Sequence, residues 1–199
     1  MRFIRQLAIS TAIGCCSLGS VQAAITVNGT LDPSDPMLPG NVRVFRDGNA
    51  STCAAAKTFP GTLGIGAAAG YKTTNAFSPA GESCITVNVD QGTCATNAFT
   101  TAYLGTFNPN DLSQNYLADQ GSSISGSFSF MAPANSQIVL MTSVSHTALT
   151  EPCSYTITSD TLSSTQAAVN PVPTLSTWAA WALTLLMTAA GITALRRKN

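Results

Sequence analysis

The C-terminal part of the chain contains the feature that most restricts its folding. Residues 177–195 carry no charged side chain, and a basic cluster of Arg196, Arg197 and Lys198 follows at once. At about 1.5 Å per residue, a helix over this stretch spans roughly 28 Å, close to the hydrocarbon core of a bilayer. We therefore predict one transmembrane helix over residues 176–199, with its basic end in the cytoplasm.

The N-terminus has the pattern of a secretory signal peptide. A short basic segment precedes an apolar stretch from Leu7 to Leu18, and small residues then lead to a cleavage site between Ala23 and Ala24. We assign residues 1–23 to the signal peptide. Two alternatives stay open, namely an uncleaved membrane span and a lipoprotein acylated at Cys15. A signal peptide at one end and a basic cluster at the other place the body outside the cytoplasm.

The charge of the body excludes two classes of partner. Between the two terminal segments the chain has four basic and nine acidic residues, a formal charge of −5. Nucleic-acid binding needs a concentrated basic surface, which this composition does not supply. Binding to anionic lipid through surface charge is excluded for the same reason.

A short motif precedes the apolar helix. Its residues are Val172, Pro173, Thr174, Leu175, Ser176 and Trp178. The order of motif, helix and basic cluster resembles the IPTL-CTERM sorting signal of exported Gram-negative bacterial proteins, a relative of PEP-CTERM tails. Val172 stands where the family has Ile, and Ala179 where it usually has Gly. Pro173 also disfavours helix in the residue before it, which keeps the motif extended.

The resemblance implies a route for the protein. Sec-type export machinery would move the body into the periplasm, while the tail anchors it transiently in the inner membrane. An exosortase-like sorting protease would then cleave near the motif. The expected destination is the cell surface or the extracellular matrix.

The body has the pattern of an all-β fold. Apolar residues alternate in short runs, and turn sequences rich in Pro, Gly, Asn and Asp separate these runs. The alternating residues are Ile25, Val27 and Leu31; Ile85, Val87 and Val89; Phe128 and Phe130; and Tyr155 and Ile157. Residues 137–144 are apolar on both faces, which favours a central strand. We predict a single β-sandwich or jelly-roll-like domain over residues 24–160 and a linker with the sorting motif over residues 161–175.

Four cysteines remain after removal of the signal peptide: Cys53, Cys84, Cys94 and Cys153. An even number in an exported chain predicts two disulfides. The sequence allows three pairings, of which we favour Cys53–Cys84 with Cys94–Cys153. A zinc site with four cysteine ligands would need closely spaced cysteine pairs, and the chain has none.

Several segments of the body resemble a module common in secreted bacterial proteins. They are residues 46–53, 57–61, 84–87, 102–109, 115–121 and 153–157. Together they are similar to the β-sandwich of bacterial pre-peptidase C-terminal domains. The resemblance implies an accessory jelly-roll module without catalytic activity, and some such modules hold calcium.

Calcium is the one cofactor for which the sequence offers ligands. Asn108, Asn110, Asp111 and Asp119 are the best set of oxygen donors. The alternative, which we favour, is that these residues form turns and exposed acidic positions. No other metal or cofactor is expected.

The sequence shows no recognisable catalytic constellation. His146 is the only histidine, and no serine lies in a G-x-S-x-G turn. We predict a non-catalytic surface or matrix protein whose sandwich binds a glycan, a polysaccharide or an envelope protein. Tyr71, Tyr103, Phe107 and Tyr116 are the candidate contact residues. The alternative is a small secreted hydrolase using dispersed carboxylates, or an accessory domain of a secreted enzyme system.

Overall fold

The computed structural model describes residues 24–65, 69–95, 97–144 and 150–166, together with Trp181 and Leu185. All strands belong to one unit, Met1–Ala167, and Ala168–Asn199 forms a second. Of the second unit only Trp181 and Leu185 are described, and both are helical and exposed. No helix within the described ranges is both long and apolar enough to cross a membrane. The signal peptide up to Ala23, the sorting motif and Arg196, Arg197 and Lys198 lie outside the described residues.

Ten strands and two short 3-10 helices make up the described fold. The strands are β1 (Ile25–Leu31), β2 (Val42–Val44), β3 (Thr62–Gly64), β4 (Tyr71–Phe77), β5 (Ser83–Asp90), β6 (Ala98–Leu104), β7 (Tyr116–Asp119), β8 (Gly126–Ala132), β9 (Gln137–Val144) and β10 (Cys153–Ser159). The 3-10 helices are η1 (Pro39–Asn41) and η2 (Gly92–Cys94).

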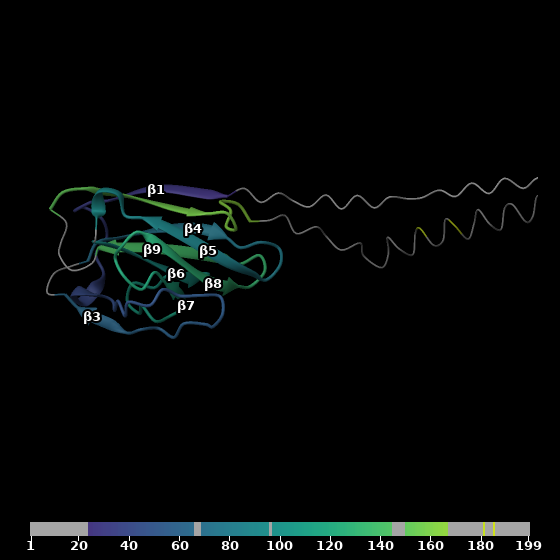
Figure 1. Ribbon diagram of the computed structural model, residues 1–199, viewed down its shortest axis with the longest axis horizontal. Helices are drawn as coiled ribbons and strands as arrows, with labels where there is room; N and C mark the ends of the chain where they lie inside the picture. The colour runs from purple at the N-terminus through teal and green to yellow at the C-terminus, as the bar shows by residue number, and fades with distance from the viewer. Residues whose placement is uncertain are drawn as a thin grey trace, which may run out of the picture. The chain divides into compact units, whose positions relative to one another are not determined.

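The strands form two four-stranded antiparallel sheets that pack as a sandwich (Figure 1). Sheet 1 has the order β1-β10-β5-β8, and sheet 2 has the order β4-β9-β6-β7. Strands β2 and β3 pair separately. From β4 onward the chain passes between the sheets at every step except the β6–β7 connection, which is the topology of a jelly roll. The predicted all-β sandwich is therefore confirmed, including β9 as an internal strand.

The interior between the sheets is built from the alternating residues of the strands. Ile85, Val87 and Ile157 have no exposed surface, and Phe128 is 2% exposed. Each such side chain contributes about 1.5–3 kcal/mol to the free energy of folding through its removal from water. On the opposing sheet, the hydroxyls of Thr100 and Thr142 satisfy one another at 3.0 Å, which allows two polar residues to be buried.

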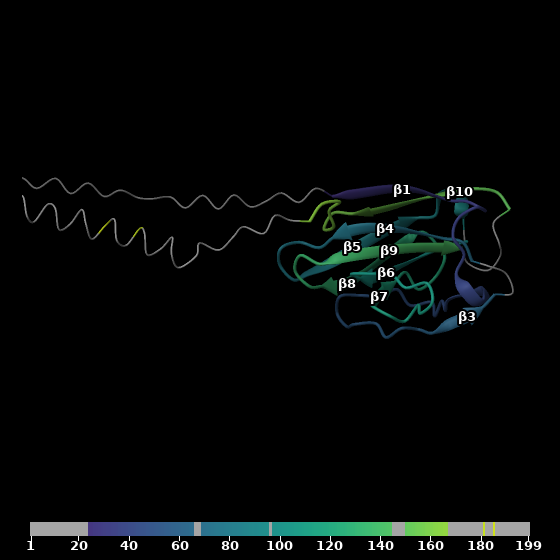
Figure 2. The same ribbon diagram turned by 180° about the vertical axis from the view of Figure 1, so that it is seen from behind.

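Sheet 2 buries both of its faces in its central strands. Six consecutive residues of β6, Ala98 to Tyr103, are buried, and so are Ile138 to Val144 of β9. Because successive side chains of a strand point to opposite faces, sheet 2 needs a second cover besides sheet 1. The connection between β2 and β3, residues 45–61, supplies it, and we call it the strap. Figure 2 shows the strap passing along β7, and its Arg46 guanidinium lies 4.5 Å from the centre of the Phe99 ring.

The folded unit continues past the predicted domain boundary at residue 160. Leu162 is fully buried, and Ser163 exchanges two backbone hydrogen bonds with Phe77 at the end of β4, at 2.9 and 3.0 Å. Residues 161–163 thus belong to the sandwich and not to the predicted linker 161–175. Composition alone misplaced the boundary, because a single buried leucine among Ser and Thr residues produces no apolar period.

Both predicted disulfides are present. Cys53 pairs with Cys84 at a Cα–Cα distance of 5.7 Å, and Cys94 pairs with Cys153 at 4.8 Å. The first joins the strap to β5, and the second joins η2 to the start of β10. Each therefore links segments that the strand ladders alone leave separate.

We expect replacement of Cys94 and Cys153 by Ala to lower the free energy of unfolding by about 2–4 kcal/mol, because the disulfide restricts the unfolded chain. Urea unfolding followed by circular dichroism measures this change. The paired Cys53→Ala, Cys84→Ala variant should lose slightly less, since its sequence separation is 31 compared with 59. An unchanged unfolding midpoint in the Cys94→Ala, Cys153→Ala variant would contradict the prediction.

Candidate functional site

The strap is fastened where the edges of the two sheets meet. Ser51 donates its N–H to the Asp119 carbonyl on β7 at 3.0 Å, and its own carbonyl accepts the Ser129 N–H from β8 at 2.9 Å. The Ser51 hydroxyl also accepts the Asp119 N–H at 2.9 Å. One strap residue therefore bridges an edge strand of each sheet, which satisfies backbone groups that the edges would otherwise leave unpaired.

The Asp119 side chain accepts three hydrogen bonds. Its carboxylate is fully buried, and Oδ1 accepts hydrogen bonds from Lys57 Nζ at 2.8 Å and from the Gly121 N–H at 2.7 Å. Oδ2 accepts a hydrogen bond from the Tyr116 hydroxyl at 2.5 Å. A buried charge with fewer partners would cost several kcal/mol, so these contacts are what make the position tolerable.

Lys57 connects this carboxylate to a second one on the strap. Its side chain is 13% exposed, and Nζ also donates to Asp47 Oδ1 at 2.8 Å and to the Asn49 carbonyl at 2.5 Å. Burial alone would raise the pKa of the Asp47 carboxyl, but the hydrogen bonds and charge of Lys57 lower it below its usual value. The strap thus brings two acids to one lysine amine.

Burial shapes the ionisation of the neighbouring groups. It lowers the pKa of Arg46 to about 9, with Arg43 adding to the effect and Asp119 opposing it. Burial likewise raises the pKa of Tyr116 far above its usual value, and the hydrogen bond to Asp119 raises it further. Tyr116 therefore keeps its proton and acts as a hydrogen-bond donor to the carboxylate.

A row of aromatic rings leads from this network to the outer surface. Phe59 contacts Tyr116 with ring centroids 5.2 Å apart, and Tyr116 contacts Tyr103 at 6.3 Å. Tyr103 contacts Phe107 at 4.9 Å, and Phe107 contacts Tyr71 at 5.2 Å. The rings meet mostly edge to face, the arrangement that their quadrupoles favour.

An open groove lies at the far end of this row, on the outer face of β4 and β9. It has a volume of about 350 Å³. Its lining residues are uncharged: Tyr71, Thr73, Asn75, Gly105, Thr106, Phe107, Pro109, Gln137 and Val139. Hydroxyl and amide groups from two strands thus surround two aromatic rings, which is a suitable lining for a neutral polar ligand.

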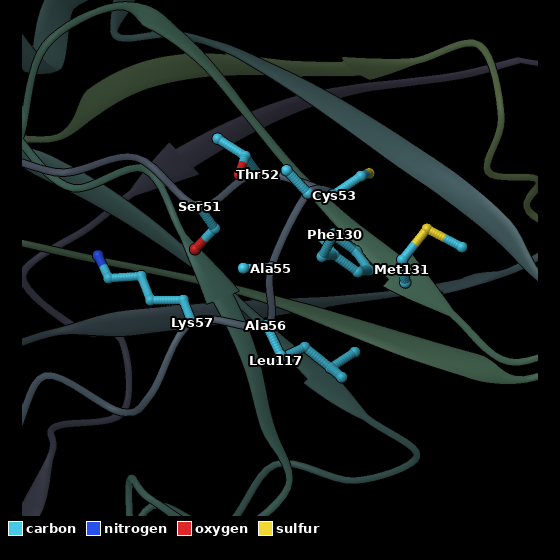
Figure 3. A pocket seen from close by; sticks show the side chains of 10 residues that line it. Ser51, Thr52, Cys53, Ala55, Ala56, Lys57, Leu117, Phe130 and Met131 are labelled. Atoms are coloured by element: carbon cyan, nitrogen blue, oxygen red, sulfur yellow. The ribbon is translucent and has the colours of Figure 1, made fainter.

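A second hollow, of about 220 Å³, lies beside the strap near the Cys53–Cys84 disulfide (Figure 3). Its walls are residues 51–57 of the strap together with Leu117, Phe130 and Met131. In Figure 3 the Lys57 side chain extends away from the sulfur-bearing residues of this hollow. The small alanine side chains of the strap leave this hollow unfilled, and few polar groups line it.

The predicted contact aromatics divide into two kinds. Tyr71 and Phe107 are half-buried and line the groove. Tyr103 has no exposed surface and so contacts no ligand, while the Tyr116 hydroxyl donates its hydrogen bond to Asp119. His146, the only histidine, lies outside the described residues.

The four predicted calcium ligands differ in environment. Asn108 Oδ1 accepts the Asn110 N–H at 3.0 Å, and Asp111 Oδ1 accepts the Ser113 N–H, also at 3.0 Å, so these residues form a surface turn. Asp119 instead lies in the interior with hydrogen bonds to both carboxylate oxygens. Across the described part of the chain, no group of three or more His, Cys, Asp or Glu residues could hold a metal ion. The side-chain oxygens of Asn108, Asp111 and Asp119 are thus all engaged in hydrogen bonds.

Sequence reasoning did not identify Lys57 as a site residue. Lys57 and Asp119 are 62 positions apart, so no local spacing reveals their contact. The one clue in the sequence was that the body has only four basic residues. One of them, Lys57, lies in an alanine-rich segment.

Comparison with protein-family models, with curated proteins and with solved structures finds no match for this chain.

We expect Gly121→Ala to be much more destabilising than Gly105→Ala. Both glycines have a φ of 74°, so both substitutions carry the same left-handed strain of about 1–2 kcal/mol. A Cβ at Gly121 would lie 2.4 Å from the Asn49 carbonyl carbon of the strap, whereas nothing lies within 4 Å at Gly105. The added clash should cost about 1–3 kcal/mol more. Thermal unfolding of the two variants measures the difference, and equal melting temperatures would show that the strap does not pack as described.

Proposed function

We propose that this chain is an exported surface or matrix protein whose sandwich binds a neutral saccharide in the groove on the outer face of β4 and β9. The observation that carries the proposal is the composition of the groove. Tyr71 and Phe107 supply aromatic surface for the C–H face of a sugar ring, and Asn75 and Gln137 supply amide donors and acceptors for its hydroxyls. The absence of charge in the lining favours a neutral ligand over a charged one.

The two disulfides support the exported location. Such bonds persist in oxidising compartments such as the bacterial periplasm and are rare in the cytosol. They are consistent with a signal peptide cleaved before Ala24 and with a C-terminal segment that sorts the body outward. We retain the IPTL-CTERM-like tail, its transmembrane helix and its exosortase-like protease as parts of this proposal.

The arrangement of the acids favours a binding module over a hydrolase. Asp47 and Asp119 approach the same atom, Lys57 Nζ, each at 2.8 Å. A glycosidase pair needs one carboxyl group to protonate the leaving group and the other to attack or activate water. Here one ammonium engages both carboxylates, of which Asp119 is fully buried and Asp47 is 27% exposed, and this suits structure and not hydrolysis.

Saccharide binding predicts a clear effect of Tyr71→Ala. Loss of the aromatic platform should weaken binding roughly tenfold or more, the range of a central interface aromatic. The measurement is binding of the purified protein to an array of immobilised neutral oligosaccharides. Phe45→Ala is the matched control, because Phe45 is 41% exposed and lies outside the groove lining.

A folding defect in Tyr71→Ala would be separated from a binding defect by Asn75→Ala. Asn75 is exposed on β4, and its replacement removes an amide from the groove without opening the core. Binding to no member of the array, or binding that survives both groove substitutions, would overturn the saccharide assignment.

The sorting proposal predicts that release depends on the motif. Full-length protein should reach the cell surface or medium with an N-terminus at Ala24 and without its tail, whereas Pro173→Ala should accumulate with the tail attached, since the motif loses its extended conformation. Cell fractionation and mass spectrometry of both termini measure this. Pro171→Ala, just outside the motif, is the control and should be released normally. Wild-type protein that stays in the inner membrane with an intact tail would refute the sorting role.

A further inference from the structure

The contact between Lys57 and Asp119 places an amine against a buried carboxyl group. The Nζ–Oδ1 distance is 2.8 Å, and the two residues come from different elements, the strap and β7. Such proximity replaces a collision between two molecules by a reaction within one, which is worth many orders of magnitude in effective concentration. The geometry is that of an ion pair whose nitrogen lies next to the carboxyl group.

The surroundings of the pair limit the access of water, which would oppose amide formation. The Asp119 carboxylate has no exposed surface, and Lys57 retains 13%. Tyr116, which donates to Asp119, packs edge to face against Phe59. Bulk water strongly favours the ion pair over the neutral amine and carboxylic acid. In a water-poor site this preference is smaller.

We propose that Lys57 and Asp119 become joined by an intramolecular isopeptide bond. Proton transfer within the pair converts the ammonium into an amine and the carboxylate into a carboxylic acid. The amine nitrogen then attacks Cγ, the Nζ–Cγ bond forms, one C–O bond breaks, and that oxygen leaves as water. No atom is oxidised or reduced, and no co-reactant is consumed.

Three neighbours are placed to assist the reacting atoms. Asp47 Oδ1 lies 2.8 Å from Nζ, so it accepts the proton that the attacking nitrogen loses and returns it to the departing oxygen. The Gly121 N–H and the Tyr116 hydroxyl donate to the two carboxyl oxygens of Asp119, at 2.7 and 2.5 Å. Each carboxyl oxygen thus has its own donor, so the oxygen that stays bound to Cγ keeps a hydrogen bond that stabilises its negative charge in the tetrahedral intermediate. Asp47 is thus the catalytic residue of the self-reaction.

The chain contains an internal comparison. Lys72 and Asp35 also form an ion pair, but their Nζ–Oδ1 distance is 3.3 Å and the Lys72 side chain is 40% exposed. No second acid is seen at Lys72 among the described salt bridges. Exposure to water and the longer distance should leave this pair unlinked.

Formation of the Lys57–Asp119 bond does not depend on saccharide binding.

Mass spectrometry of the wild-type protein tests the bond directly. The full chain is purified as exported, reduced, alkylated, denatured and digested with chymotrypsin. The expected result is one cross-linked peptide that joins Lys57 to Asp119 and is lighter than its two components by one water molecule. Trypsin should fail to cut after Lys57 but should cut after Lys72.

Two variants separate the bond from the ion pair. Lys57→Arg keeps the positive charge but lacks the amine, so the mass deficit should disappear. Asp47→Asn keeps the size of the side chain but removes the proton acceptor, and it should slow bond formation by roughly 100-fold or more. Time courses of the cross-linked fraction measure this rate.

The wild-type digest decides the matter even where a variant fails to fold. Recovery of separate peptides containing Lys57 and Asp119, each at its full mass, would overturn the proposal. Equal cross-linking in wild type and Asp47→Asn would overturn the catalytic role of Asp47.

Discussion

The burial of both faces of sheet 2 is the constraint on which the rest of the structure depends. Sheet 1 covers one face, and the strap must cover Phe99 on the other, because this ring would otherwise lie in water. The strap has no regular structure with which to hold itself in place. It is fixed by Ser51 at the junction of β7 and β8, by the Cys53–Cys84 disulfide, and by the contact of Lys57 with Asp119. A buried carboxylate at the sheet edge is stable only with such a partner.

The sequence predicted the half-buried strands and the central strand β9, but it missed β6, which is also buried on both faces. Alternation at Ile85, Val87 and Val89 marked β5 because only one of its faces is apolar. Strand β6 shows no alternation, since residues 98–103 are all buried and include small and hydroxyl side chains. Strand β4, with its Lys and Thr residues, resembles a loop in composition and is recognised only through its pairing with β9.

The sequence named four candidate aromatic residues without separating them, and only Tyr71 and Phe107 line the groove. The number of cysteines predicted two disulfides, but three pairings were open, and the favoured one is present. The charge network could not be inferred, because Lys57, Asp47 and Asp119 meet only once the strap has folded across sheet 2. Long-range contacts of this kind leave no periodic signal in the chain.

The row of packed aromatic rings connects the strap to the groove. Tyr116 holds Asp119 at one end, and Phe107 lines the groove at the other, with Tyr103 buried between them. Close-packed side chains transmit displacement because the interior has little free volume. Fixing the strap therefore also fixes the ring against which a ligand would rest, which lowers the ordering cost of binding. A disulfide can do this only while it stays oxidised. The proposed amide between Lys57 and Asp119 would hold the same segment under reducing conditions, so the two cross-links are complementary and not redundant.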